Sequence, residues 1–289
     1  MTKSRALVWI VIAYMAALFI GGASLYWIDQ NPLVNIFIAD LVATLVVFGF
    51  SRWFTNSSFY DAYWSVIPPF IALYWMAHST VAVPPLRTLL MLGLILYWAT
   101  RLTLNWAVHW QGIEHEDWRY VMLKQNHPRS AFWIDLAGIH LFPTLQVFAG
   151  MLPVYAVLCL SDAPFNWLDI IAALVTFTAV TIQMLGDFQL HAFNDTKQPG
   201  DSIRTGLWGW SRHPNYFGEI GFWFGLFLFG LAARPQDWYW MGIGFVAMTL
   251  MFLFASIPMM EKRSLERRPQ YQEVIDSVSM LVPWPPKSN

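Results

Sequence analysis

The densest group of side chains with chemical potential lies between residues 204 and 219, in the run RTGLWGWSRHPNYFGE. Four members of this run, His213, Asn215, Tyr216 and Glu219, can hydrogen-bond or titrate. The run also holds two arginines suited to phosphate oxygens, Arg204 and Arg212, and two glycines that permit close backbone approach, Gly206 and Gly218. An apolar stretch follows, so Pro214 should interrupt helix formation just before it, and Asn215 to Glu219 should form the first helical turn with backbone donors turned towards the loop. This pattern suits an anionic cofactor.

Further polar residues recur at helical spacing inside apolar runs. Arg101, Asn105 and His109 follow an i, i+4, i+8 pattern, as do Gln183, Asp187 and His191. Glu219 lies one turn inside its own apolar run, on the same helical face as Asn215. Ionisable groups at such depth should face a helix bundle or a wet cavity. The two stripes therefore indicate either a buried polar clamp between helices or a ligand pocket.

The elements that position these residues should all be transmembrane helices. Of the 289 residues 57% are hydrophobic and 12% are charged, whereas an average soluble domain has roughly 25% charged residues. A bilayer crossing needs about 20 apolar residues. Eight runs of about that length are predicted as spans: 6–28, 33–51, 63–83, 88–110, 133–160, 166–188, 217–233 and 237–258. We predict an all-α polytopic bundle, a single integral membrane domain over residues 1–289, with the least certain boundary in the fifth run, which carries Pro143 and Pro153.

The distribution of basic residues predicts the orientation of the bundle. With the N-terminus in the cytoplasm, 15 of the 17 Lys and Arg residues fall on the cytoplasmic side, and only Arg87 and Arg234 fall outside. Both termini, including the tail 259–289, and nearly all polar chemistry are therefore expected on the cytoplasmic side.

Several classes of function are disfavoured by composition. A net charge of −1 leaves no basic field for nucleic acid. A single cysteine, Cys159, and seven histidines without an HxxxH pair give no recognisable metal site, so no metal is predicted. No GxGxxG follows a strand, which excludes a Rossmann domain. A nucleotide would have to be held by helix ends and loops.

At the 204–219 run the chain resembles a bacterial membrane family of unknown function grouped with the steroid 5-alpha-reductase C-terminal domain. That group is related more distantly to sterol reductases and isoprenylcysteine carboxyl methyltransferases. The residues that carry the resemblance are Asp187, Arg204, Gly206, Leu207, the run 211–219, the runs 61–65 and 116–120, Arg101, Pro258, Glu261, Tyr271 and Pro283.

The resemblance implies a helical bundle in the bacterial cytoplasmic membrane. Its cytoplasmic half, roughly 160–289, would bind NADPH, and a lipophilic substrate would enter from the lipid. The reductase pattern puts Asp187, Arg204, Asn215 and Glu219 at the cofactor, with the tail around 261–268 closing over it. The Gln-Glu pair that grips the steroid in classical steroid 5-alpha-reductases is not found here, and Met260 and Glu261 replace their His-rich cluster. Cofactor binding is thus better supported than steroid recognition.

The predicted reaction is NADPH-dependent reduction of a C=C bond conjugated to a carbonyl. Tyr216 and Tyr120 are the predicted acids, supported by Glu219. The predicted cofactor-binding residues are Asp187, Lys197, Arg204, Arg212, His213, Asn215, Glu261 and Arg267, and the predicted substrate pocket contains Asp61, Trp64, Arg101 and Asn105.

Two other functions compete with this prediction. A methyltransferase that uses S-adenosylmethionine is the alternative, because membrane methyltransferases share the Arg-His-Pro-x-Tyr-x-Gly core. A transporter is disfavoured, since no inverted repeat is visible and the polar residues cluster towards one membrane face. The identity of the substrate and the oligomeric state stay open.

Overall fold

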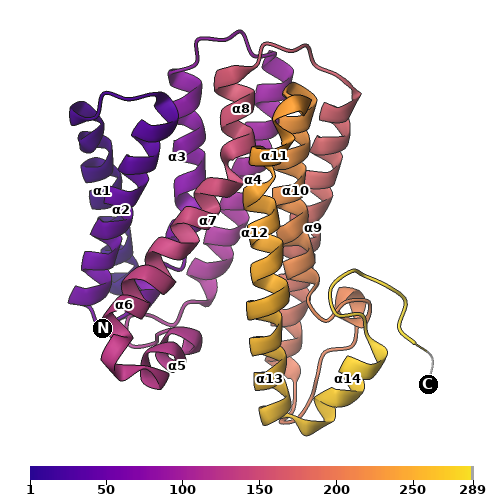
Figure 1. Cartoon of the computed structure of the whole chain (residues 1–289). Coiled ribbons are helices and arrows are strands. Elements are labelled where there is room, and N and C mark those ends of the chain that lie inside the picture. The colour runs from indigo at the N-terminus through magenta and orange to yellow at the C-terminus, as the bar shows by residue number, and fades with distance from the viewer. Residues whose placement is uncertain (288–289) are drawn as a thin grey trace. The chain divides into compact units, whose positions relative to one another are not determined.

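The computed structural model describes residues 1–287, and this part of the chain is helical with no β-strand (Figure 1). Within it, seven segments are long and apolar enough to cross a membrane: Lys3–Trp27, Pro32–Trp53, Pro85–His109, Pro128–Gly150, Trp167–Thr196, Pro214–Ala233 and Pro235–Arg267. The chain is an all-α, multi-pass membrane protein, as its hydropathy predicts.

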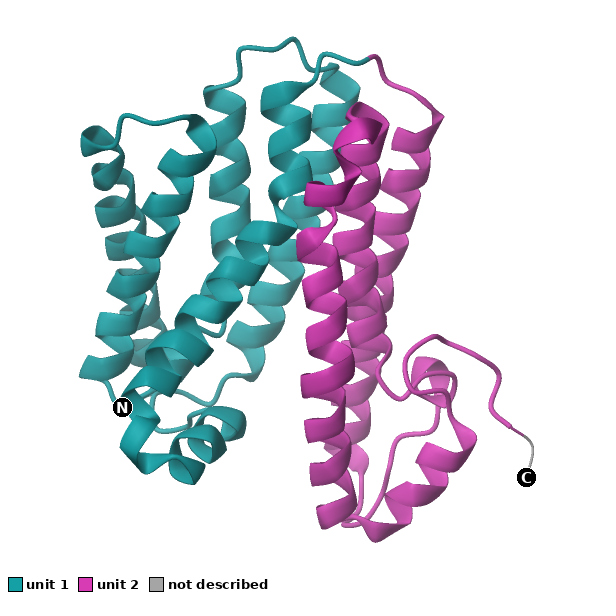
Figure 2. Cartoon of the chain, viewed as in Figure 1, with its two compact units in different colours: residues 1–163 teal, residues 164–289 magenta. Residues whose placement is uncertain are grey.

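The helices form two compact units, residues 1–163 and 164–289 (Figure 2). Unit 1 contains α1 (Lys3–Ser24), α2 (Pro32–Trp53), α3 (Tyr63–Ala77), α4 (Pro85–His109), α5 (Trp118–Asn126), α6 (Ala131–Trp133), a π-helix (Ile134–Leu141), α7 (Phe142–Gly150) and α8 (Leu152–Leu160). Unit 2 contains α9 (Trp167–Thr196), α10 (Pro214–Ala233), α11 (Trp238–Met241), α12 (Ile243–Met251), a π-helix (Phe252–Ser256), α13 (Ile257–Arg267) and α14 (Gln272–Ser277). Unit 2 covers the half of the chain in which a cofactor is predicted.

The third predicted span, 63–83, is corrected by the structure. α3 ends at Ala77 after 15 residues. At about 1.5 Å per residue this helix is roughly 22 Å long, less than the roughly 30 Å of a hydrocarbon core. The chain then runs without helix to Pro85, which begins α4. Seven of the eight predicted spans therefore contain a helix long enough to cross a membrane, and the third contains a shorter one.

The fifth predicted span, 133–160, is interrupted. It begins as α6 and a π-helix, continues as α7, and breaks at Met151 before α8. Pro143 and Pro153 each lie in the first turn of a helix, where a missing backbone N–H leaves no hydrogen bond unmade. The prolines thus divide the apolar run into separate helices.

In unit 1, close contacts join α1 to its neighbours. A Cβ placed on Gly21 would lie 2.8 Å from the carbonyl oxygen of Ala39, so this glycine allows α1 to approach α2. Tyr14 donates a hydrogen bond to the carbonyl of Phe59 at 2.9 Å, and Lys3 donates one to the carbonyl of Val108 at 2.6 Å. The start of α1 and the end of α4 therefore share one end of this unit.

In unit 2, glycines allow α9 and α10 to pack closely. A Cβ on Gly218 would lie 2.5 Å from the carbonyl oxygen of Ala179, and one on Gly225 would lie 2.0 Å from Oγ1 of Thr176. The sequence suggested that Gly218 admits a cofactor. Its close approach is instead to the neighbouring helix, as in other membrane helix pairs.

We expect Gly225→Ala to destabilise the protein by about 1–3 kcal/mol, because the new methyl group must force α10 away from Thr176. Gly93→Ala in α4 is the matched control, since a Cβ there would meet no atom within 4 Å. The control should be neutral or slightly stabilising because alanine favours a helix over glycine. Thermal unfolding in detergent measures both, and equal losses in the two variants would contradict the packing role of Gly225.

Candidate functional site

Unit 2 contains a cavity of about 600 Å³ between the end of α9, the loop that follows it, and α13. Six of the predicted site residues line it: Lys197, Arg212, His213, Asn215, Tyr216 and Arg267. The first and last of them, Lys197 and Arg267, are 70 positions apart in the sequence. The fold brings all six to one cavity. Arg268 and Tyr271, beyond α13, complete this side of the cavity.

The loop between α9 and α10 is held against α9 at two points. The backbone N–H of Leu207 donates to Oε1 of Gln189 at 2.9 Å, and the indole of Trp208 donates to the carbonyl of Gly186 at 2.9 Å. Gly206 has a φ of +60°, a conformation that glycine adopts readily, and its backbone packs against the side chain of Gln189. α10 begins at Pro214, one residue before the predicted first turn of 215–219.

Arg212, which lines the cavity, also holds the C-terminal tail. Its Nε donates to Glu261 at 2.7 Å, and its Nη1 donates to the carbonyls of Ile275 and Val278, both at 2.8 Å. Its backbone N–H donates to the carbonyl of Ser279 at 2.9 Å. Because these bonds use most of its donors, Arg212 attaches the C-terminal tail to the motif loop.

Glu261 has a similar positioning role and does not line the cavity. Its Oε1 accepts from Arg212 and lies 3.1 Å from Nε2 of His213. The imidazole of His213 stacks on the ring of Tyr216, with centroids 5.3 Å apart and planes within 5°. Tyr216 in turn packs on Phe252 at 4.6 Å. Glu261 thus orients a stacked pair of rings at the cavity wall.

The basic groups around the cavity differ in how firmly the protein holds them. Arg268 donates to the carbonyl of Asp201 at 2.9 Å and to Ser264 at 3.3 Å. Lys197 is exposed and donates to Asn194 at 2.6 Å. Arg267 has no hydrogen bond or ion pair with any residue in the described range 1–287. Arg267 and Lys197 are therefore the cations most available to an anion.

Besides Glu261, three further predicted residues of unit 2 lie outside the cavity wall. Arg204 pairs with Glu273 at 2.8 Å and lines a separate depression of about 390 Å³. Asp187 is 3.5 Å from the amide of Asn215. The carboxylate of Glu219 is buried and accepts from Gln183 at 3.0 Å and from Trp223 at 2.9 Å. Its contacts join α9 to α10, and this explains a carboxylate within the apolar run.

The predicted substrate-pocket residues belong to unit 1. Tyr120 donates a hydrogen bond to Asp61 at 2.8 Å, so the fold joins a predicted acid to a predicted pocket residue. Trp64 meets Trp98 edge to face at 5.7 Å. Arg101 and Asn105 lie in the second half of α4. Burial, and then the charge of Asp61, raise the pKa of Tyr120 well above its usual value, so this tyrosine retains its proton.

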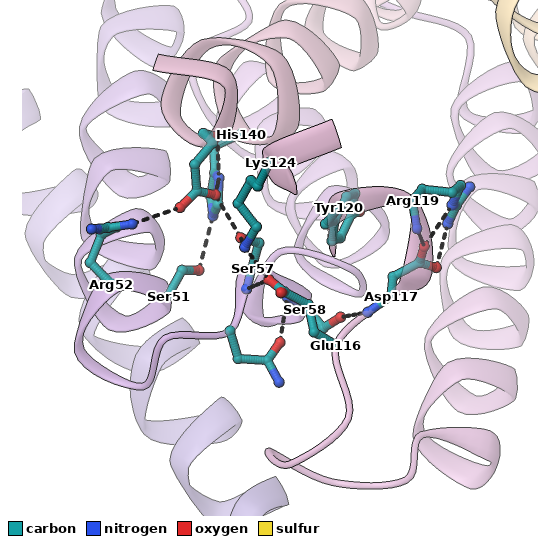
Figure 3. A network of polar contacts seen from close by, with 12 residues as sticks. Ser51, Arg52, Ser57, Ser58, Glu116, Asp117, Arg119, Tyr120, Lys124 and His140 are labelled. Atoms are coloured by element: carbon teal, nitrogen blue, oxygen red, sulfur yellow. Dashed lines mark hydrogen bonds and ion pairs between the residues drawn. The ribbon is translucent and has the colours of Figure 1, made fainter. Parts of the chain in front are cut away.

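Around this pair, unit 1 holds a polar network that the sequence did not predict (Figure 3). Lys124 donates to Glu116 at 2.6 Å and to Ser57 at 3.1 Å, and Ser57 donates to Asp135 at 2.6 Å. His140 lies 2.9 Å from Ser51 through Nε2. Glu116 and Lys124 were visible as charged loop residues, whereas Asp135 and His140 stand alone in an apolar run and gave no pattern.

We expect Asp61 to make stability dependent on pH. Burial, with a smaller effect of Asp117, raises the pKa of Asp61 from 3.8 to about 6. The neutral form is thus favoured in the folded state, and the stability it contributes is lost as the pH rises through 6. The cost of ionisation above that pH is on the order of 2–3 kcal/mol.

Asp61→Asn should remove this dependence. The stability of this variant relative to the unsubstituted protein should therefore increase between roughly pH 5 and pH 8, a range that includes the folded-state pKa of Asp61. Asp29→Asn, at an exposed turn, is the control. Unfolding temperatures in detergent across this range check the prediction. A constant difference between Asp61→Asn and the unsubstituted protein would contradict it.

Within residues 1–287, no group of three or more His, Cys, Asp or Glu side chains is placed to hold a metal ion.

Comparison with known proteins identifies the family. An uncharacterized protein of Schizosaccharomyces pombe is 25% identical to this chain, over 89% of this chain and 81% of the relative. No solved structure matches the chain. The model of one family, described as "Protein of unknown function (DUF1295)", matches residues 47–278, which include most of unit 1 and the cavity of unit 2. The chain is a member of that membrane protein family.

Proposed function

We propose that this protein is a membrane reductase that binds NADPH in the cavity of unit 2 and reduces a C=C bond of a lipophilic substrate. The observation that carries the proposal is the cavity itself: about 600 Å³, bounded by the 204–219 motif and lined by Lys197, Arg212, Arg267 and Arg268. This volume is usual for a small-molecule site. The resemblance of the same motif to the steroid 5-alpha-reductase C-terminal domain supports the choice of cofactor.

The distribution of charge in the cavity suits the phosphates of a dinucleotide. Arg267 and Lys197 extend from opposite sides, α13 and the end of α9, and only Asp201 brings negative charge to the lining. Charge-assisted hydrogen bonds between arginine and phosphate are among the strongest polar contacts.

In the proposed reaction NADPH, when bound, supplies a hydride to one carbon of the double bond. The second carbon then needs a proton, and Tyr216 holds one at the cavity wall. The Tyr216 ring is fixed between His213 and Phe252, so its hydroxyl has a defined direction. Glu261 and Arg212 position His213 and the motif loop without lying at the reacting atoms.

S-adenosylmethionine is the alternative cofactor, because the Arg-His-Pro-x-Tyr-x-Gly core is present from Arg212 to Gly218. S-adenosylmethionine has no phosphate, so the two cations most available at the cavity, Lys197 and Arg267, favour NADPH. Saturation binding of each cofactor to purified protein separates the two. Binding of S-adenosylmethionine with no response to NADPH would refute the proposal.

We expect Arg267→Ala to weaken NADPH binding by about 10- to 100-fold, the effect of one lost charge-assisted hydrogen bond of about 1.5–3 kcal/mol. The side chain of Arg267 is exposed and makes no hydrogen bond or ion pair within residues 1–287, so the fold should be unchanged. Arg263→Ala, one turn earlier on α13 and absent from the cavity lining, is the matched control. Isothermal titration with NADPH measures both. Equal affinities for Arg267→Ala and the unsubstituted protein would exclude Arg267 from the phosphate site.

A further inference from the structure

α2 carries a buried polar stripe inside unit 1. Asp40, Thr44 and Ser51 are spaced i, i+4 and i+11, and at most 2% of each is exposed. Asp40 Oδ1 accepts a hydrogen bond from Tyr63 at 3.2 Å. Its Oδ2 has no hydrogen-bond partner in the part of the chain that the structure describes. An acid that lies in a long apolar helix and makes a single hydrogen bond needs an explanation.

Hydroxyl groups connect Asp40 to the rest of the interior. Tyr63 donates to Asp40, and Thr44 lies four residues after Asp40 on α2. Thr44 Oγ1 lies 2.9 Å from Oγ1 of Thr144, and the hydroxyl of Tyr60 lies 2.7 Å from the same atom. These groups are hydroxyls, so they carry no positive charge that could compensate a carboxylate.

The row meets the network of Figure 3 at His140. Thr144 donates to the carbonyl of His140 at 2.9 Å, and the ring of Tyr60 contacts the imidazole edge to face at 5.1 Å. Beyond His140 the polar groups continue through Asp135 and Ser57 to the ion pair of Glu116 and Lys124. We call the whole path, from Asp40 to Lys124, the polar seam.

The two buried acids of the seam have opposite surroundings. Asp135 lies 3.5 Å from the guanidinium of Arg52 and accepts from Ser57, so its negative charge is compensated. Asp40 forms no ion pair with any described Lys, Arg or His. The titratable groups nearest to it are tyrosines: Tyr63 in α3, Tyr60 before it, and Tyr14 in α1, whose ring is 5.7 Å from that of Tyr63. A buried carboxylate without a cation is unfavourable, so the neutral acid is the form that fits.

We propose that Asp40 is a proton-binding site that is occupied at neutral pH. The ligand is the proton, and the proposal does not rest on the reductase function. The proton resides on Oδ2 of Asp40, which has no hydrogen-bond partner among the described residues, while Oδ1 accepts from Tyr63.

Infrared difference spectroscopy of the full chain in detergent tests the assignment, since a protonated carboxyl group has a C=O band separate from carboxylate bands. We expect this band at neutral pH, its loss in Asp40→Asn, and its retention in Asp135→Asn. Tyr63→Phe keeps Asp40 and removes its hydrogen bond, so the band should move to higher frequency. This second variant tests the proposal even if Asp40→Asn does not fold. A missing band, or a band unchanged by both Asp40→Asn and Tyr63→Phe, would overturn the proposal.

Discussion

Replacement of Tyr216 by phenylalanine is expected to lower the rate of NADPH-dependent reduction by about 100- to 10,000-fold, the usual range for a lost general acid. NADPH affinity should change little. The ring of Tyr216 packs between His213 and Phe252, and phenylalanine preserves both contacts. The variant therefore removes the hydroxyl without disturbing the wall of the cavity.

Tyr271→Phe is the matched control for this effect. Tyr271 lines the same cavity, and its ring contacts the guanidinium of Arg268 at 5.4 Å, a contact that phenylalanine also keeps. Burial raises the pKa of Tyr271, so its proton is less readily released. Single-turnover oxidation of NADPH with a steroid 4-en-3-one or a long-chain 2-enone measures both variants. If both substitutions lowered the rate equally, the assignment of Tyr216 as proton donor would fail.

Replacement of Arg212 by leucine is expected to destabilise the protein by about 3–5 kcal/mol, because it leaves Glu261 as an uncompensated, mostly buried charge. The side chains of Arg212 and Glu261 are only 8% and 16% exposed. Two backbone carbonyls, those of Ile275 and Val278, lose their donor as well. The tail should separate from the motif loop, so limited proteolysis should cut it faster.

Arg204→Leu is the matched control, because it distinguishes the loss of the Arg212 contacts from the loss of one positive charge. Arg204 and Glu273 are 45% and 67% exposed, so their pair should contribute less than about 1 kcal/mol. Thermal unfolding and the rate of tail cleavage are measured for both variants. A similar small change in the two would show that Arg212 does not hold the tail.

The membrane class and most of the helices could be predicted from sequence because hydropathy is a local property. A run of about 20 apolar residues requires no information about its neighbours to be assigned as a span. The same locality explains the error at α3, where an apolar run of sufficient length ends as a helix at Ala77. Where a helix stops within an apolar run depends on the loop that must reach Pro85, and composition does not report that.

The candidate site was predicted in part. The residues after Pro214 were correctly placed at the start of a helix, and the charged residues of the motif loop lie beside a cavity. Arg212 and Glu219 were assigned to the cofactor because their types suit it. Their partners lie far away in the chain, such as Val278, 66 positions after Arg212, and Gln183, 36 positions before Glu219. A side chain's role depends on these partners.

The sequence by itself thus determined that this protein is a helical membrane protein with a cationic, aromatic motif before α10. Only the tertiary structure decided which of those residues are available to a ligand. The fold gives protein partners to Arg212, Glu219 and Gly218 within unit 2. It places Lys197, Arg267 and Tyr216 at the cavity. It also joined Asp40, Thr144 and His140 into one seam, although no pattern links them along the chain. The physical reason is that burial in lipid is set residue by residue, whereas hydrogen bonds and ion pairs are set by which distant segments meet.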